Sequence, residues 1–231
     1  MSRYVARSAA LLVLALLFAG RDVSAQTAST PSIRWIEIEL GGGLLGGAPL
    51  GTADANLRAN ERTAQPYRLF TADHRFEKTG QFHLRASRLF GARWGVEGGL
   101  AIGHPVLRAD VSADIEGAPA LAISETVDQY FFDAALVVAF EEFRLGRLVP
   151  FATGGAGYLR QLHEGQTVIE HGHLFQAGAG VRYPFLSRAS GLVRAAGLRG
   201  DVRGYVLRGG VSVNDRPRPH IAISGGVFVG F

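Results

Sequence analysis

The most constraining feature of this sequence is an alternation of apolar with small or polar residues at every second position, which recurs in eight segments. Such a period of two is typical of β-strands that present two different faces. The clearest case is 34–45, where Ile36 and Ile38 alternate with Glu37 and Glu39. The eight segments are 34–45, 79–90, 94–102, 127–141, 148–162, 172–183, 198–210 and 220–231. We therefore predict an all-β fold.

The connections between these segments alternate in length. The first, third, fifth and seventh are 46–78, 103–126, 163–171 and 211–218, whereas the second and fourth are tight. An even number of strands with long loops at one end and short turns at the other is typical of an outer-membrane barrel. We predict an eight-stranded antiparallel up-and-down transmembrane β-barrel with both termini in the periplasm. The sixth connection, 184–197, is longer than this pattern prefers.

The polar faces of the segments are too sparse for a surface in water. They carry isolated charges among glycines and alanines, whereas a water-facing surface has about 25–35% charged residues. An eight-stranded barrel has an interior just wide enough for side chains. We therefore expect the apolar faces to contact lipid and the charges to pair inside the barrel as a plug, because an unpaired charge there would be costly. This predicted lumen network consists of Glu37, Glu39, Arg85, Glu97, Asp133, Arg182 and Arg203.

Aromatic residues gather near the predicted strand ends, as in the girdles of membrane barrels. They include Phe90 with Trp94, Phe131 beside Tyr130, Phe151 and Tyr183.

The N-terminus has the features of an export signal. Arg3 and Arg7 precede an apolar run at 9–20, which is too short for the roughly 20 residues of a membrane-spanning helix. We predict a signal peptide at 1–25 that is cleaved between Ala25 and Gln26, a short lead at 26–33 and the barrel at 34–231. The chain has no cysteine, which excludes disulfides.

The charge and the glycine-rich stretches indicate neither a nucleic-acid-binding surface nor a cofactor-binding site. The formal net charge is only +4, too mild for a nucleic-acid-binding surface. The glycine-rich stretches at 41–47 and 154–159 lack the context of a nucleotide-binding loop. The long loops 47–77 and 104–126 are mostly polar, and loops of this length are commonly functional or disordered.

Together these features resemble the small outer-membrane β-barrel proteins of Gram-negative bacteria, the OmpA/OmpX-like group. In that family the last strand ends in an aromatic residue after alternating apolar residues, and the assembly machinery recognises it. Ile223, Val227, Val229 and Phe231 match this pattern, although the usual tyrosine is absent. The resemblance implies a monomer in contact with outer-membrane lipid and lipopolysaccharide. It also implies periplasmic chaperones and the barrel-assembly machinery as partners during biogenesis.

Two groups of polar residues could carry chemistry. His163, His171 and His173, with Glu164 and Glu170, are metal-ligand types, but they lack the spacing of a structural zinc site, and a solvated loop is the favoured interpretation. A hydrolase would need a set such as Ser124, Glu125 and Asp128 with His104 or His173. No nucleophile motif accompanies them, so we expect no enzyme.

The leading hypothesis is an integral outer-membrane barrel with a structural, surface-interaction or narrow-pore role. One alternative is a lipid-modifying outer-membrane hydrolase. The other is an exported soluble barrel that binds a hydrophobic ligand. That alternative requires an apolar interior, so the face that Glu39, Arg85 and Asp133 occupy distinguishes it from the leading hypothesis.

Overall fold

The structure is a computed structural model of the 231-residue chain. It describes residues 36–57, 67–90, 93–112, 119, 121–164, 168–188, 191–213 and 216–231. The predicted signal peptide, its cleavage site at Ala25 and Gln26, and the lead at 26–33 lie outside the described residues. Among the residues described, no helix has the length and apolar character to cross a membrane.

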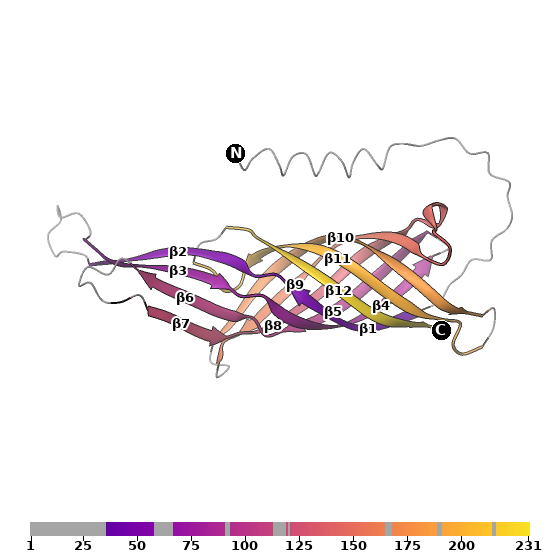
Figure 1. Ribbon diagram of the computed structural model, residues 1–231, viewed down its shortest axis with the longest axis horizontal. Coiled ribbons are helices and arrows are strands. Elements are labelled where there is room, and N and C mark those ends of the chain that lie inside the picture. The colour runs from indigo at the N-terminus through magenta and orange to yellow at the C-terminus, as the bar shows by residue number, and fades with distance from the viewer. Residues whose placement is uncertain are drawn as a thin grey trace. The chain divides into compact units, whose positions relative to one another are not determined.

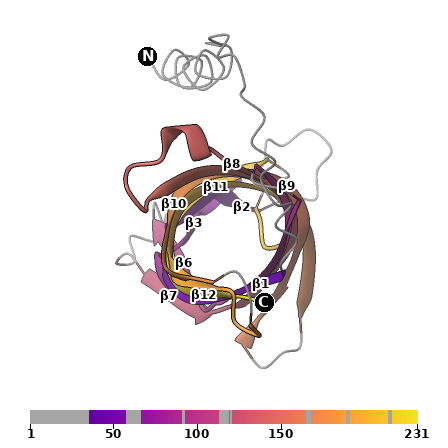
Figure 2. The same ribbon diagram turned by 90° about the vertical axis from the view of Figure 1, so that its right-hand side faces the viewer.

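Eight strands close into a barrel, in which each strand pairs antiparallel with the barrel strands before and after it in the chain (Figures 1 and 2). The first strand, β1, closes the ring by pairing with both β4 and β12. The strands are β1 (Ile36–Leu45), β4 (Thr79–Phe90), β5 (Trp94–Gly103), β8 (Asp128–Ala139), β9 (Val149–Leu162), β10 (Ile169–Ser187), β11 (Ala195–Gly209) and β12 (Arg218–Gly230). The predicted fold class, an eight-stranded antiparallel barrel, is confirmed.

The two ends of the barrel differ, and we call them the turn end and the loop end. At the turn end the connections are 91–93, 140–148 with a short 3-10 helix η1 (Glu141–Phe143), and 188–194. The backbone N–H of Phe231 donates to the carbonyl of Ile36 there, at 2.9 Å. The sixth connection is shorter than predicted, because β10 continues to Ser187 and β11 starts at Ala195.

The first two long connections, at the loop end, are not loops, and this part of the prediction is wrong. They form a second sheet of β2 (Ala48–Leu57), β3 (Tyr67–Phe76), β6 (Val106–Ser112) and β7 (Leu121–Thr126), in the order β2-β3-β6-β7. Figure 1 shows this sheet extending beyond the barrel. Pairing of β3 with β6 joins two hairpins that lie apart in the sequence. Such non-local pairing cannot be read from a local pattern in the sequence, because strand propensity depends strongly on tertiary context.

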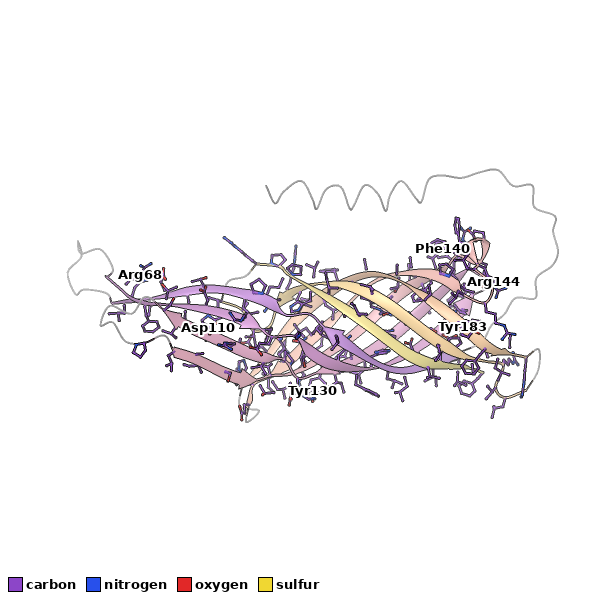
Figure 3. All side chains as sticks on the ribbon, in the orientation of Figure 1. Arg68, Asp110, Tyr130, Phe140, Arg144 and Tyr183 are labelled. Atoms are coloured by element: carbon purple, nitrogen blue, oxygen red, sulfur yellow. The ribbon has the colours of Figure 1, made fainter. Side chains whose placement is uncertain are left out.

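The barrel strands point their charged residues inward and their apolar residues outward. In β1, Glu37 and Glu39 are 1% and 2% exposed, whereas Ile36 and Ile38, which alternate with them, are 55% and 44% exposed. Figure 3 shows side chains projecting outward all along the barrel, Tyr130 and Tyr183 among them. Every barrel strand has such exposed apolar residues, for example Ile38, Leu84, Val96, Leu136, Tyr158, Phe175, Val202 and Ile223.

This apolar exterior places the barrel in a membrane. A continuous apolar surface of this size is unfavourable in water and stable in hydrocarbon. Closure of the barrel also pairs the backbone N–H and C=O groups, which hydrocarbon requires. Glu39, Arg85 and Asp133 lie on the inner face, so the alternative of a soluble barrel with an apolar interior is wrong.

Apolar side chains fill the interior toward the loop end. One cluster contains Leu45, Phe131, Leu159, Leu174, Tyr205, Leu207 and Ala222. Within it, the rings of Phe131 and Tyr205 stack with centroids 5.5 Å apart. A second cluster, Leu50, Phe76, Val127 and Val211, lies where the second sheet meets the barrel. The girdle prediction is therefore wrong for Phe131 and Phe151, which are 3% and 1% exposed, because they share the inward face of their strands with polar residues.

Candidate functional site: the charged interior of the barrel

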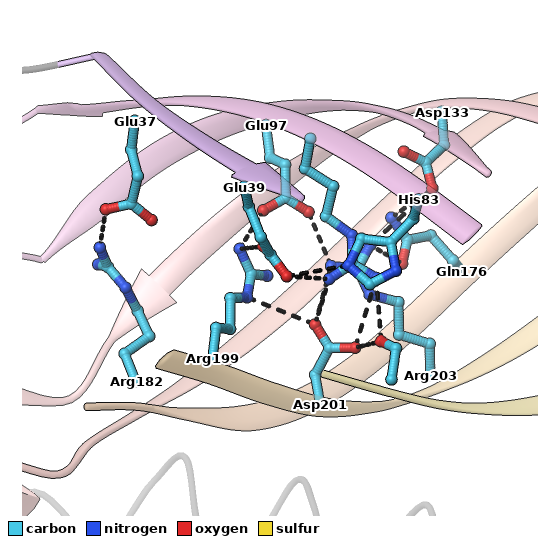
Figure 4. A network of polar contacts seen from close by, with 12 residues as sticks. Glu37, Glu39, His83, Glu97, Asp133, Gln176, Arg182, Arg199, Asp201 and Arg203 are labelled. Carbon is cyan, nitrogen blue, oxygen red and sulfur yellow. Dashed lines mark hydrogen bonds and ion pairs between the residues drawn. The ribbon is translucent and has the colours of Figure 1, made fainter. Parts of the chain in front are cut away.

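Charged side chains from six strands meet inside the barrel (Figure 4). We call this set, together with His83, the lumen network. Its carboxylates are Glu37, Glu39, Glu97, Asp133 and Asp201, and its guanidinium groups are Arg85, Arg182, Arg199 and Arg203. Five acids face four arginines, so the network is close to neutral as a whole. That balance is what burial requires, because an isolated charge in a water-poor interior is strongly unfavourable.

The carboxylate of Glu39 joins three strands. Its Oε1 lies 3.0 Å from Nε2 of His83 and accepts a hydrogen bond from Nη1 of Arg85 at 3.1 Å. Its Oε2 lies 3.1 Å from Nη1 of Arg199. Glu39 comes from β1, His83 and Arg85 from β4, and Arg199 from β11. These contacts therefore connect β1 to the neighbouring β4 and to β11, which is not its neighbour.

Asp201 lies beside this cluster and is surrounded by donors. It accepts hydrogen bonds from Arg85 at 2.8 Å and from Arg203 at 3.2 Å. The hydroxyl of Ser224 also donates to it, and Nε of Arg199 lies 3.4 Å away. A carboxylate with this many cationic neighbours is well stabilised as an anion.

Glu97 of β5 binds two arginines from the opposite side of the barrel. One oxygen accepts from Arg203 at 2.7 Å, and the other accepts from Arg199 at 2.5 Å. The side chain of Arg199 also lies over the ring of Phe151, with its guanidinium carbon 4.3 Å from the ring centroid. Because β5 and β11 are not neighbours in the sheet, these bonds hold the barrel wall across the lumen.

Two further contacts extend the network along the barrel. Arg182 pairs with Glu37, and its guanidinium carbon lies 4.9 Å from the ring centroid of Phe228. On the other side of the network, Gln176 donates to Asp133 at 3.3 Å. Arg203 lies 3.9 Å from the same carboxylate. Charged and aromatic groups thus alternate through the interior.

Glycines on the inner face leave the space that these side chains occupy. A Cβ on Gly99 would lie 2.4 Å from Oδ1 of Asp133. A Cβ on Gly180 would lie 2.7 Å from both Asp201 Cβ and Phe151 Cζ. The glycine-rich composition of these strands therefore has a packing reason at these two positions.

A small cavity lies within the network. This cavity, lined by His83, Arg85, Asp133 and Tyr205, among others, measures about 10 Å³. That is about the room for one water molecule. Chemically, the arrangement is a set of mutually neutralising ion pairs that cross-links the barrel and leaves this space closed to larger solutes.

The structure brings together all seven residues of the predicted lumen network. His83, Arg199 and Asp201 also belong to the network and were not predicted as members of it. The signal was present, because alternation places Arg199 and Asp201 on the same face as Arg203, and His83 on the same face as Arg85.

The three histidines considered for a metal are not gathered around a common point. His163 lies 3.0 Å from Glu125, whereas His171 and His173 are exposed on the outer face of β10. The Tyr158 hydroxyl is hydrogen-bonded to Nδ1 of His171. Within the described ranges, no group of three or more metal-ligand residues is arranged to hold an ion.

The residues of the hydrolase alternative are not assembled either. Asp128 lies 2.7 Å from His104, and Glu125 binds His163. Ser124 is exposed on β7 and, in the part of the chain that the structure describes, has no hydrogen bond to a histidine.

The residues predicted as a C-terminal assembly signal share the outer face of β12. Ile223 and Val227 are 59% and 50% exposed, Phe231 is 41% exposed, and Val229 is half-buried. The intervening Phe228 points inward and is 1% exposed.

Comparisons with known proteins find similarity in structure only. No protein-family model matches the sequence, and no curated protein matches it significantly. The OmpA/OmpX-like resemblance therefore stays a prediction.

Similar solved structures are outer-membrane proteins. The attachment invasion locus protein Ail of Yersinia pestis, in complex with the heparin analogue sucrose octasulfate, is 14% identical, with a TM-score of 0.38 over 84% of this chain and 98% of Ail. The outer membrane protease OmpT from Escherichia coli is 10% identical, with a TM-score of 0.40 over 90% of this chain and 100% of OmpT. The outer membrane protein AlkL is 16% identical, with a TM-score of 0.43 over 92% of this chain and 96% of AlkL. At these values no functional property of the three transfers to this chain.

Proposed function

We propose that this protein is an outer-membrane barrel with a closed lumen, and that it acts through the sheet β2-β3-β6-β7 at the cell surface. In this proposal the turn end and both termini face the periplasm. The observation that carries it is the lumen network, which fills the interior with ion pairs instead of leaving a water-filled path. A narrow-pore role is the less favoured alternative for that reason.

Apolar side chains in the barrel interior also support a closed lumen. Toward the loop end the network is followed by the stacked rings of Phe131 and Tyr205 and by leucines such as Leu159 and Leu174. Toward the turn end, Phe151 and Phe228, each 1% exposed, lie within the network, next to the Glu37–Arg182 pair that ends it. An ion would have to pass the paired charges and aromatic rings of the network and then the apolar layer toward the loop end, and apolar constrictions oppose ion passage.

The open edge of the second sheet supports a surface role. β7 is an edge strand of this sheet, and its Leu121 and Ile123 are 59% and 55% exposed. An edge strand with unpaired backbone groups and exposed apolar side chains can accept an extended segment of a partner. The barrel would then serve as the anchor that holds this edge outside the membrane.

Conductance across a planar bilayer tests the closed lumen. We expect purified wild-type protein, verified as folded by its heat-modifiable gel mobility, to give no stepwise currents. Regular current steps from such protein would contradict the proposal.

The orientation can be tested because the chain contains no cysteine. We expect an Ile123→Cys variant to react with a membrane-impermeant maleimide on intact cells, since β7 lies at the loop end. Its control is Arg144→Cys, which lies at the turn end just after η1 and should react only after the outer membrane is opened. The reverse labelling pattern would overturn the proposed orientation.

A further inference from the structure

A groove crosses the lipid-facing side of the barrel over β4, β5, β8 and β9. Its volume is about 630 Å³, and it is shallow and open toward the lipid. One small residue from each strand forms its floor: Ala86, Gly98, Ala134 and Ala156. These four are direct partners across the strands, so the floor is continuous. Phe132 and Tyr158 belong to the next row of side chains and form one wall.

The groove descends from the loop end toward the turn end. Ala86 lies only four residues before Phe90, the turn-end residue of β4. Ala156, at the other end of the floor, lies seven residues after Val149, the turn-end residue of β9. Strands in barrels tilt by about 35–45° from the axis, so a row of residues that crosses them runs diagonally. The groove therefore runs obliquely through the membrane, a path that an acyl chain can follow.

A cluster of basic side chains lies at the upper end of this groove. Tyr158 is paired across the strands with His173, and His173 is paired with Arg208. One row nearer the loop end, Arg160 is paired with His171. All four basic residues are exposed on the outer face, and cross-strand partners on one face have Cβ atoms about 4.5–5.5 Å apart.

The arginines of this cluster have no acidic partner. Neither Arg160 nor Arg208 forms an ion pair with any residue that the structure describes, in contrast to the arginines of the lumen network. Two carboxylates on the adjoining strands have histidine partners of their own, since Glu170 lies 3.9 Å from His163 and Asp128 lies 2.7 Å from His104. The cluster therefore presents uncompensated positive charge beside an apolar groove.

We propose that this groove and cluster form a binding site for a phosphate-bearing lipid of the surrounding membrane. The phosphate lies against Arg160 and Arg208, with the Tyr158–His171 pair between them. One acyl chain lies in the groove over Ala156, Ala134, Gly98 and Ala86. Charge complementarity selects the headgroup, because arginine binds phosphate through several N–H donors at once. This inference rests on the membrane location in the proposed function, but not on the closed lumen or the surface role.

Native mass spectrometry of the purified barrel in a non-ionic detergent tests this site. Phosphatidylglycerol is titrated as the anionic lipid and phosphatidylcholine as the lipid without net charge. We expect wild type to retain one phosphatidylglycerol in preference to phosphatidylcholine. An Arg160→Gln/Arg208→Gln variant should bind phosphatidylglycerol roughly 10- to 30-fold more weakly, given the usual contribution of each arginine near an anionic lipid surface.

The acyl-chain part of the site has its own variant. Ala134→Leu/Ala156→Leu fills the groove and should reduce retention of both lipids, whereas the arginine variant should abolish only the preference between them. Arg88→Gln/Arg188→Gln is the control for charge, because both residues are exposed near the turn end. Ala179→Leu is the control for size, because it lies on the outer face of β10 outside the groove.

Equal retention of the two lipids by wild type would overturn the proposal. So would an arginine variant that matches the Arg88/Arg188 control. All variants are first verified as folded by heat-modifiable mobility. Because conductance and cysteine labelling are measured separately, failure of lipid binding remains distinguishable from failure of the proposed function.

Discussion

The barrel interior and the second sheet use charge in opposite ways. In the interior, Glu97 is 2% exposed and Arg203 is 1% exposed, and each has several partners. In the sheet, Arg75 and Asp110 also form an ion pair, at 2.8 Å, but their side chains are 49% and 33% exposed. Water can replace a partner in the sheet and cannot do so in the interior. Similar ion pairs are therefore essential in one region and dispensable in the other.

The largest effect is expected from breaking the interior network. Replacing Glu97 by leucine leaves Arg199 and Arg203 without their shared carboxylate. Loss of one partner of a buried ion pair typically destabilises by about 3–5 kcal/mol. We expect the urea midpoint of the barrel in lipid vesicles to fall accordingly.

The matched variant in the sheet is Arg75→Leu, for which we expect no measurable shift of that midpoint. Equal shifts for Glu97→Leu and Arg75→Leu would remove the distinction between the two regions.

The end of the chain gives a second contrast, between Phe228 inside the barrel and Phe231 outside it. Phe228→Ala removes a buried ring and should lower the free energy of unfolding by about 3 kcal/mol, at the low end for such truncations. Phe231→Ala should leave stability nearly unchanged and slow assembly into the outer membrane. Pulse-labelling of folded protein in cells, together with urea unfolding, separates the two effects. If Phe228→Ala slows assembly as much as Phe231→Ala does, the assembly signal is not confined to the outer face.

Neighbouring glycines of β5 allow the inner and outer faces to be compared within one strand. Gly99→Val forces the side chain of Asp133 to move, because even a Cβ would lie 2.4 Å from its Oδ1. Overpacking of this kind costs about 1–3 kcal/mol. At Gly98 the nearest atom to an added Cβ is 3.9 Å away. Gly98→Val should therefore unfold at the same urea concentration as wild type, and a larger loss there than at Gly99 would contradict the assigned facing.

The smallest effect concerns pH in the sheet. The hydrogen bond from Arg108 is the main cause that holds the pKa of Asp110 below its usual value; burial opposes this shift, and the charges of Arg108 and Arg75 add to the lowering. A lowered pKa means that the contribution of Asp110 is complete above the usual aspartate pKa and is lost as the pH falls. Hydrogen exchange of the β3–β6 amides should therefore stay constant between about pH 5 and 8, after correction for the intrinsic rate, and rise only below about pH 4. A transition near neutral pH would indicate a different group.

The facing of the barrel strands was predictable because the two faces of each strand meet different surroundings. One face meets hydrocarbon and the other meets a packed interior, so residues such as Ile38 and Glu39 must alternate. The second sheet was not predicted, although β2 alternates exposed Thr52 and Asp54 with less exposed Ala53 and Ala55. Its alternation is carried by small residues over a short stretch, and the pairing of β3 with β6 is non-local.

The sequence by itself determined the number of barrel strands, their facing and the presence of charges inside, because a period of two is a local property of the chain. Only the tertiary structure decided which charges meet. Glu97 and Arg203 are separated by 106 positions and lie on strands that are not neighbours, so their contact depends on closure of the barrel. Pairing of β10 with its neighbours β9 and β11 likewise brings Arg160, His173 and Arg208 beside one groove. No local pattern encodes these groupings, since they arise from strand register and, across the lumen, from closure of the ring.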